Sequence, residues 1–352
     1  MEMTPTERTD PRLAADRLSS AARGDFCVIV PAFDEAPVIG DLVREMRQAF
    51  QQYGLTGEVL IVDDGSTDGT AELALKAAAG WPHLKVVRHR TNQGKTEALL
   101  TGAAATTKGW LILFDADLQH LPEEIPRFLA KAAADGLDMV TGRKVGAYDK
   151  RGVSSVYNAL GRRLFDVPVS DMNSMKAFRR EILQEVMLRH DWHRYLVVLA
   201  SARGYRVGEI DIELHPRRAG VSKYQGLGRI VVGVLDLLSV GFLLRFSGKP
   251  LLLFGSVGAA LLAAGIGTGL VAIWMRFVMD FGFRPLLYLV MLLVTLGVLM
   301  IGIGFMSELV AQLRDELRAT RHASERVSAE SSRRVEVPAT EPDPVDDPKG
   351  KA

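Results

Sequence analysis

The stretch WLILFDADLQH, residues 110–120, decides the fold class of this chain. Its first four residues form a short continuous apolar run, which predicts a strand buried on both faces within a parallel sheet. Asp115 and Asp117 follow where that strand ends. Residues two apart on an extended chain point to the same side, so both carboxylates are expected to face one point. Such a pair, with a carbonyl oxygen from Gln119, predicts a site for Mg²⁺ or Mn²⁺, although a solvated turn at a strand end has the same sequence.

Two earlier segments show the same pattern of a buried strand that runs into acidic residues. FCVIVPAFDE, residues 26–35, ends in Glu35, and EVLIVDDGSTDGT, residues 58–70, contains Asp63 and Asp64. Helical spacing predicts helices near 38–50 and 121–136, and a further helix is expected through Ala105 after the polar segment 92–98. Further apolar runs predict strands at 84–87 and 137–141. Alternating strands and helices predict an α/β fold with a doubly wound sheet. Ligands of such sheets bind beyond the carboxyl ends of the strands, so both acidic groups are expected at one ligand-binding edge.

Composition divides the 352 residues into five parts. Residues 1–24 are polar, lack the apolar region of a signal peptide and are predicted to form a disordered tail. Residues 25–225 hold the pattern of strands and helices. Residues 226–249 alternate apolar stretches with charges, which predicts an amphipathic helix at the membrane interface or, alternatively, a third membrane span. Residues 250–312 are predicted to form a transmembrane hairpin, and 313–352 a largely disordered cytoplasmic tail.

The hairpin prediction rests on two uncharged stretches, residues 251–275 and 285–306. Each is longer than the roughly 18 residues that mark a membrane-spanning helix, so spans are placed at 251–275 and 285–310; a pair of buried soluble helices is the alternative. Positive charge is denser on both flanks than in the connection, which predicts that both ends lie in the cytoplasm, at the inner membrane of the cell. Gly265 and Gly269 allow close helix approach, either within the hairpin or between subunits of a homo-oligomer.

Charge and cysteine content exclude several classes of protein. The net charge of +1 gives no basic field for nucleic acid. The single cysteine, Cys27, excludes an intramolecular disulfide and a zinc cluster of the finger type. No G-x-G-x-x-G joins the first strand to its helix, which argues against a dinucleotide-dependent oxidoreductase. His120, His193 and His215 have no metal-ligand spacing and are predicted to be structural.

Five motifs, taken in order, resemble the family 2 glycosyltransferases of GT-A fold. They are VIVPAFDE at 28–35, VDDGSTDGT at 62–70, NQGKTEAL at 92–99, FDADLQ at 114–119 and HPRRAGVSKY at 215–224. The likeness covers about residues 26–250 and is greatest to the dolichol-phosphate mannose synthases and bacterial polyprenyl-phosphate glycosyltransferases. It implies a mixed, Rossmann-like sheet that binds a nucleotide-sugar.

The resemblance also implies roles for single residues. Pro31, Phe33 and Glu35 line the nucleotide base and ribose, and Asp63 and Asp64 hold the nucleoside. Asp115, Asp117 and Gln119 hold the metal ion and the diphosphate. Lys95, Arg143, Arg151, Ser155, Arg217 and Lys223 bind the phosphates of donor or acceptor, and Asp171 belongs to the acceptor loop. Catalysis is assigned to Asp117, Asp171, Arg151 and Arg217.

Chemistry supports the same assignment. A metal ion held by carboxylates, together with arginines, stabilises the charge that develops on a diphosphate leaving group. A polyprenyl phosphate has a second pKa of about 6, so it is ionised at neutral pH and needs cationic positioning more than a base. The chain is therefore predicted to transfer a hexose, with inversion, from a UDP- or GDP-linked donor to a polyprenyl phosphate at the cytoplasmic face of the membrane.

Two other functions stay open. Transfer to a lipid hydroxyl, as in diacylglycerol or ceramide, requires a positioned base, for which Asp171 is the candidate. A non-enzymatic membrane scaffold would keep the fold without needing the acidic cluster, and that cluster is intact. A processive polysaccharide synthase is disfavoured because the sequence lacks Gln-x-x-Arg-Trp.

Overall fold

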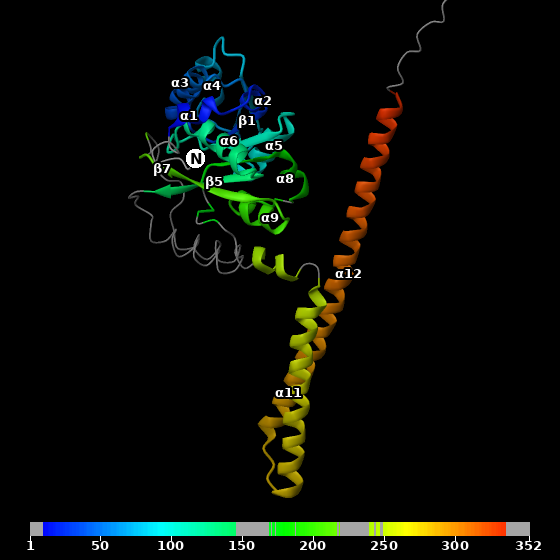
Figure 1. Cartoon of the computed structure of the whole chain (residues 1–352). Helices are drawn as coiled ribbons and strands as arrows, with labels where there is room; N and C mark the ends of the chain where they lie inside the picture. The colour runs from blue at the N-terminus through cyan, green and yellow to red at the C-terminus, as the bar shows by residue number, and fades with distance from the viewer. Residues whose placement is uncertain are drawn as a thin grey trace, which may run out of the picture. The chain divides into compact units, whose positions relative to one another are not determined.

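A computed structural model gives the fold. It describes residues 10–145, 169, 171–172, 174–186, 188–216, 218, 239–242, 244–246 and 249–335, with side chains to residue 317 and at 320. The chain forms two compact units, Met1–Gly241 and Phe242–Ala352, which are described separately below (Figure 1).

The first unit is built on one seven-stranded sheet. Its strands are β1 (Phe26–Ala32), β2 (Glu58–Asp63), β3 (Leu84–Arg88), β4 (Trp110–Leu113), β5 (Met139–Val145), β6 (Lys176–Arg179) and β7 (Val207–Glu213), in the order β3-β2-β1-β4-β6-β5-β7. The helices are α1 (Pro11–Asp16), α2 (Ser20–Gly24), α3 (Ala36–Tyr53), α4 (Thr70–Ala77), α5 (Lys95–Ala104), α6 (Glu124–Asp135), α8 (Arg180–Glu185), the 3₁₀ helix η1 (Trp192–Tyr195) and α9 (Leu196–Ala202). The prediction of a mixed α/β sheet is confirmed.

Strand β6 makes the sheet mixed. It pairs antiparallel with β4 on one side and with β5 on the other, whereas β1 pairs in parallel with β2 and β4. The carboxyl ends of β1, β2, β4 and β5 therefore share an edge with the beginning of β6, where Lys176 lies opposite Leu113. Residues 171–179 are predicted from the sequence only as part of an acceptor loop. The antiparallel strand brings this segment to the ligand-binding edge.

Helices cover both faces of the sheet. Val28 of β1 belongs to the same apolar cluster as Leu42 of α3 and Phe128 of α6, so these helices cover one face. The next residue, Ile29, points to the opposite face, where α5 lies. A Cβ atom at Gly102 of α5 would stand 2.5 Å from Ile29 Cγ2, so only glycine lets this helix approach the strand so closely.

The prediction of disorder through residue 24 is wrong for the segment from residue 10. Asp10 caps α1 by accepting a hydrogen bond from the Arg12 amide (2.8 Å), and Ser19 caps α2. Ala15 and Leu18 are buried in the main apolar cluster. Two apolar residues among many polar ones give a weak pattern in the sequence, yet they are sufficient to dock this segment onto the sheet unit.

The second unit contains a helical hairpin of α11 (Pro250–Val278) and α12 (Arg284–Val335), which run side by side in Figure 1. Pro250–Val278 and Arg284–Leu317 are long and apolar enough to be membrane spans. A Cβ atom at Gly258 would lie 2.8 Å from the carbonyl oxygen of Gly297, and one at Gly265 would lie 2.8 Å from Val294 Cγ2. The glycines therefore serve close packing within the hairpin, which answers the question left open for Gly265.

Helix α12 corrects the predicted boundary of the C-terminal tail. Disorder is predicted from 313, whereas the helix continues to Val335. Residues 313–335 contain no glycine or proline, and their Glu, Arg and Ala residues favour a helix, although they provide too few apolar residues for a packed core. Within the predicted interfacial helix, residues 239–242 and 244–246 are helical, and residues 226–238 lie outside the described part of the chain.

Candidate functional site

The segments that follow β1 and β2 are held together by hydrogen bonds. The Asp34 amide donates to Ser66 Oγ (2.9 Å), and the Glu35 amide donates to Thr70 Oγ1 (2.9 Å). In return, the Thr67 amide donates to the Asp34 carboxylate (3.0 Å). The hydroxyl-rich sequence after β2 thereby fixes the backbone at Phe33 to Glu35, which is the segment predicted to line the base and ribose.

Asp63 is an architectural residue. Its side chain is fully buried, and Oδ1 accepts a hydrogen bond from the Ser66 amide at 2.9 Å. The other oxygen faces Arg88 Nε at 3.2 Å. The carboxylate thus shapes the turn after β2 and is held by an arginine of the neighbouring strand β3.

Asp64 also has an architectural role, because its carboxylate accepts hydrogen bonds from within the protein. Its Oδ1 accepts hydrogen bonds from His89 Nδ1 (2.7 Å) and from the Gln93 amide (2.9 Å). Its Oδ2 accepts one from the Gly94 amide (2.7 Å). His89 in turn contacts Thr101 Oγ1 of α5 at 2.9 Å. This buried carboxylate therefore anchors the loop that leads into α5. Its predicted contact with a nucleoside stays a prediction.

The loop held by Asp64 positions Lys95, the first residue of α5. Gly94 has φ +94°, a backbone conformation that favours glycine, and the helix begins directly after it. The Lys95 ammonium contacts Asp115 Oδ1 from across the sheet edge. The Asp115 side chain is 40% exposed. Loss of solvent around this carboxyl would raise its pKa. The ammonium of Lys95 outweighs that effect and holds the pKa below its usual range.

Asp117 and Gln119 lie on a turn after β4. The expectation that this backbone is extended is wrong: residues 116–117 form a turn and Leu118 has φ +52°. Asp117 is nearly buried and accepts a hydrogen bond from the Gln119 amide at 3.1 Å. Gln119 also exchanges hydrogen bonds with His215, whose amide donates to the Gln119 carbonyl at 2.9 Å. The first residue of HPRRAGVSKY therefore meets the acidic turn.

This donor set fits a hard divalent cation. Asp115, Asp117 and Gln119 offer two carboxylates and an amide oxygen on one turn, and Mg²⁺ typically takes only one or two protein carboxylates beside water and phosphate oxygens. In the part of the chain that the structure describes, no group of three or more His, Cys, Asp or Glu side chains forms a closed metal site. The Lys95 ammonium already places one cation against Asp115.

Strand β5 sends neighbouring residues to different partners. Arg143 forms a bidentate ion pair with Asp211 of β7, with its Nη2 atom 2.8 Å from Oδ2, and both side chains are about half exposed. Lys144 lies 3.6 Å from Asp171 Oδ2, and this pair is largely buried. Successive residues of a strand point to opposite faces, so Arg143 and Lys144 reach different partners. Lys144, rather than Arg143, therefore contacts Asp171 of the predicted acceptor loop. The assignment of Arg143 to a phosphate stays a prediction.

Lys176 is a buried lysine at the same edge, and sequence reasoning did not select it. Its side chain is 1% exposed and its ammonium donates to the Ser174 carbonyl at 2.8 Å. Burial lowers its pKa to about 7, and Lys95 and Lys144 add to that effect, whereas Asp171 and Asp115 oppose it. The four-residue strand Lys176–Arg179 has a cationic residue at each end, so the local sequence gives no signal that this lysine is buried.

Two buried histidines border this group. His193 Nδ1 lies 3.1 Å from Thr96 Oγ1, and burial together with Lys95 holds the His193 pKa well below its usual value. Burial lowers the pKa of His120 to about 4, against the attraction of Asp115. Both imidazoles are therefore neutral at neutral pH. The remaining predicted site residues, Arg151, Ser155, Arg217 and Lys223, lie outside the described residues.

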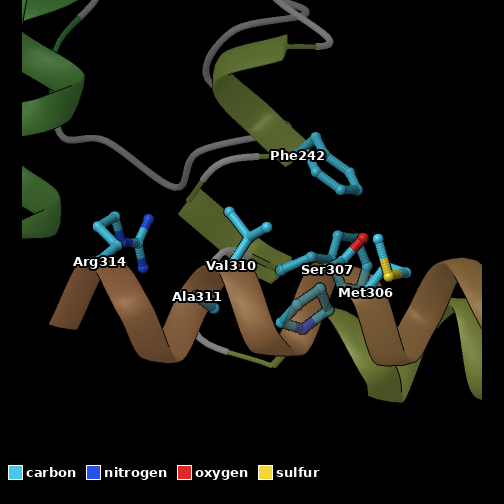
Figure 2. Close-up of a pocket in the computed structure, with 8 residues that line it drawn as sticks. Phe242, Met306, Ser307, Val310, Ala311 and Arg314 are labelled. Atoms are coloured by element: carbon cyan, nitrogen blue, oxygen red, sulfur yellow. The ribbon is translucent and has the colours of Figure 1, made fainter. Parts of the chain in front are cut away.

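The hairpin unit has an apolar groove of its own. Figure 2 shows its lining, with Arg314 at one end of a row that includes Val310, Ser307 and Met306. Among the residues that the structure describes, the lining consists of Phe242, Phe246, Pro250, Met306, Ser307, Val310, Ala311 and Arg314.

The fold and the acidic edge define the class of protein, and comparisons agree: the chain belongs to glycosyl transferase family 2, whose family model matches residues 27–187. It is 33% identical to the dodecaprenyl-phosphate galacturonate synthase of Rhizobium johnstonii over 82% of this chain and 88% of that protein. It is 28% identical to the undecaprenyl-phosphate 4-deoxy-4-formamido-L-arabinose transferase of Salmonella paratyphi B, over 83% of this chain and 90% of the relative. The predicted class of enzyme, a glycosyltransferase, is confirmed.

Solved structures show the same fold. One is mannosyl-3-phosphoglycerate synthase from Rubrobacter xylanophilus, with a TM-score of 0.54 and 17% identity over 67% of this chain and 79% of that chain. Another is glucosyl-3-phosphoglycerate synthase from Mycobacterium tuberculosis in complex with Mn²⁺, UDP and phosphoglyceric acid, with a TM-score of 0.52 and 18% identity over 66% and 81%. At this identity the likeness concerns the fold.

Proposed function

We propose that this glycosyltransferase moves a hexose from a nucleoside-diphosphate sugar to a polyprenyl phosphate, with inversion and with a divalent metal ion. The observation that carries the proposal is the set of three lysines, Lys95, Lys144 and Lys176, that interact with the carboxylates of Asp115 and Asp171. Donor and acceptor each bring phosphate groups to the bond that forms. Ammonium groups placed beside the acidic turn and the acceptor loop would stabilise those charges.

The acidic turn would hold the metal ion through Asp115, Asp117 and Gln119. When bound, the ion neutralises charge on the diphosphate leaving group. Lys95, the first residue of α5, contacts Asp115 of this turn. Its ammonium would therefore stabilise the leaving diphosphate. The backbone at Phe33 to Glu35, fixed by Ser66 and Thr70, would orient the base and ribose.

The surroundings of Asp171 favour a phosphate acceptor over a hydroxyl. A hydroxyl acceptor requires a base within hydrogen-bond reach of its proton. The Asp171 residue is only 4% exposed and its carboxylate is ion-paired with Lys144. An ionised phosphate needs no such base, and Lys144 and Lys176 lie where its charge would be neutralised. Two relatives are named as a dodecaprenyl-phosphate synthase and an undecaprenyl-phosphate transferase, and both names support this acceptor class.

The two candidate spans support a membrane location. We place the catalytic unit at the cytoplasmic face of the inner membrane because positive charge flanks the hairpin at both ends. A homo-oligomer stays a prediction. A cysteine introduced between Met279 and Gly282 should then react with a membrane-impermeant reagent on intact cells. Reaction only after lysis would contradict this topology.

One assay tests the acceptor class. The purified full-length chain is incubated with UDP- and GDP-hexoses and with either polyprenyl phosphate or the matching polyprenol, and mass spectrometry detects the lipid products. We expect transfer to the phosphate alone. Arg217→Ala should reduce use of the phosphate by one to two orders of magnitude, equivalent to about 1.5–3 kcal/mol for one charge-assisted contact. Efficient transfer to polyprenol that Asp171→Asn abolishes would instead establish the hydroxyl alternative.

A further inference from the structure

Lys95 stands where a metal ion would have to bind. Its ammonium contacts Asp115 Oδ1, one of the two carboxylates offered to the ion. An ammonium and a divalent cation at the same carboxylate repel each other. Metal binding at this oxygen therefore requires the ammonium to move away.

The contact is suited to exchange. Lys95 is 27% exposed and Asp115 is 40% exposed, and ion pairs so open to solvent are held weakly. The buried Lys144–Asp171 pair at the same edge has 15% and 6% exposure, which makes it the more permanent contact. Of the two lysines, Lys95 is the one whose ammonium can leave its carboxylate without leaving a buried charge behind.

The backbone of Lys95 stays in place during such a move. The Gln93 and Gly94 amides before it donate to Asp64, and Thr96 after it contacts His193. Only the flexible four-carbon side chain is able to swing. The ammonium therefore has a short arc of positions around the acidic turn, all of them close to a diphosphate that binds there.

The metal set also depends on the donor. Two carboxylates that each bind through one oxygen, together with one amide oxygen, leave half of the six positions of Mg²⁺ to water and phosphate. Among the described residues, no third acidic or histidine side chain completes the set. A diphosphate would supply the missing oxygens and, at the same time, an anion for Lys95.

We infer that Lys95 couples metal binding to donor binding. Without a donor its ammonium occupies the cation position at Asp115 and weakens metal binding; with a donor it transfers to the diphosphate and releases Asp115 to the metal ion. This inference rests on the proposed nucleoside-diphosphate donor. It assigns Lys95 a positioning role between two ligands, beyond a contact with phosphate.

Electron paramagnetic resonance of Mn²⁺ tests the inference without measuring turnover. Free Mn²⁺ is titrated with the purified full-length chain, with and without UDP or GDP. Lys95→Met should bind Mn²⁺ alone about tenfold more tightly than the natural chain, a typical coupling factor. The gain in Mn²⁺ affinity on adding nucleotide should shrink by the same factor. Lys85→Met, which removes a surface ammonium 3.7 Å from Glu58, is the matched control and should change neither value.

Two outcomes separate this inference from the proposed function. Unchanged or weaker Mn²⁺ binding by a folded Lys95→Met chain, whose melting temperature serves as the check, would overturn the coupling even if sugar transfer from the nucleotide donor is observed. Tighter Mn²⁺ binding by Lys95→Met in a chain that responds to neither UDP nor GDP would uphold Lys95 as the competing cation and contradict the proposed donor.

Discussion

Two pairs of aspartates, Asp63–Asp64 and Asp115–Asp117, follow buried strands of one sheet and look alike in the sequence. In the fold, the first pair accepts hydrogen bonds from three backbone amides and an imidazole, and its side chains are nearly inaccessible. Asp115 is 40% exposed and meets a flexible ammonium. Asp117 is nearly buried and accepts from the Gln119 amide, so this contrast concerns Asp115. Carboxylates that accept from several backbone amides and an imidazole hold loops, whereas Asp115, paired with a mobile cation, is able to accept a different one.

The largest expected effect comes from the second pair. Asp117→Asn keeps an oxygen that accepts from the Gln119 amide but removes the charge, so the fold should persist. Activity should fall by about 10²–10³-fold, the usual cost of losing one group that stabilises transition-state charge. Initial rates of lipid glycosylation and the melting temperature of the full-length chain check both parts. EDTA should act in the same direction on the natural chain, and full turnover in EDTA would refute the metal site.

The first pair should affect stability instead. Asp64→Asn turns an NH₂ group toward amides or an imidazole that now donate to a carboxylate, and should lower the free energy of unfolding by about 2–4 kcal/mol. Asp41→Asn, which removes an exposed carboxylate paired with Arg44, should change it by less than about 1 kcal/mol. Denaturant unfolding of the full-length chain compares the two. A loss of activity without a loss of stability in Asp64→Asn would place this residue with Asp115 and Asp117.

Neighbouring residues of β5 extend the comparison to cations. Lys144→Met should reduce acceptor-side kcat/KM by one to two orders of magnitude, or about 1.5–3 kcal/mol, because it removes an ammonium beside Asp171. Arg143→Met should have a small effect, since Arg143 is paired with Asp211. In Lys144→Met, the carboxylate of Asp171 loses its ion-pair partner while it stays buried. The double variant Lys144→Met/Asp171→Asn removes both charges and controls for that effect. The opposite order of effects would restore the phosphate role that the resemblance assigns to Arg143.

The last comparison concerns pH. Lys176 releases its proton at about pH 7 in the folded chain, whereas the unfolded chain keeps it up to a pKa of 10.5. Between these values the unfolded state binds more protons, so stability due to Lys176 should rise with pH. Burial is the main cause of this lowered pKa, and Lys95, Lys144, Asp115 and Asp171 modify it. Melting temperatures between pH 7 and pH 10 should rise less in Lys176→Met than in the natural chain; equal slopes would contradict the shift.

Part of this molecule follows from local sequence. Apolar runs predict β1, β2 and β4 because buried parallel strands need continuous apolar residues, and the length of the uncharged stretches predicts α11 and α12. The acidic cluster at the strand ends is placed correctly at one edge, since parallel strands share a direction. Motif resemblance gives the family, which the relatives confirm.

The rest required the tertiary structure. Local spacing carries no information on which residues meet when 20 to 97 positions separate them, as in the contacts Lys95–Asp115 and Thr96–His193. Strand β6 is too short and too irregular in composition to be recognised, yet its antiparallel pairing places Lys176 opposite Leu113. The sequence by itself determined the fold class and the acidic edge, because both depend on periodicity and run length. Which aspartates serve the architecture and which face cations was decided only by packing, because burial and partners are properties of the folded chain.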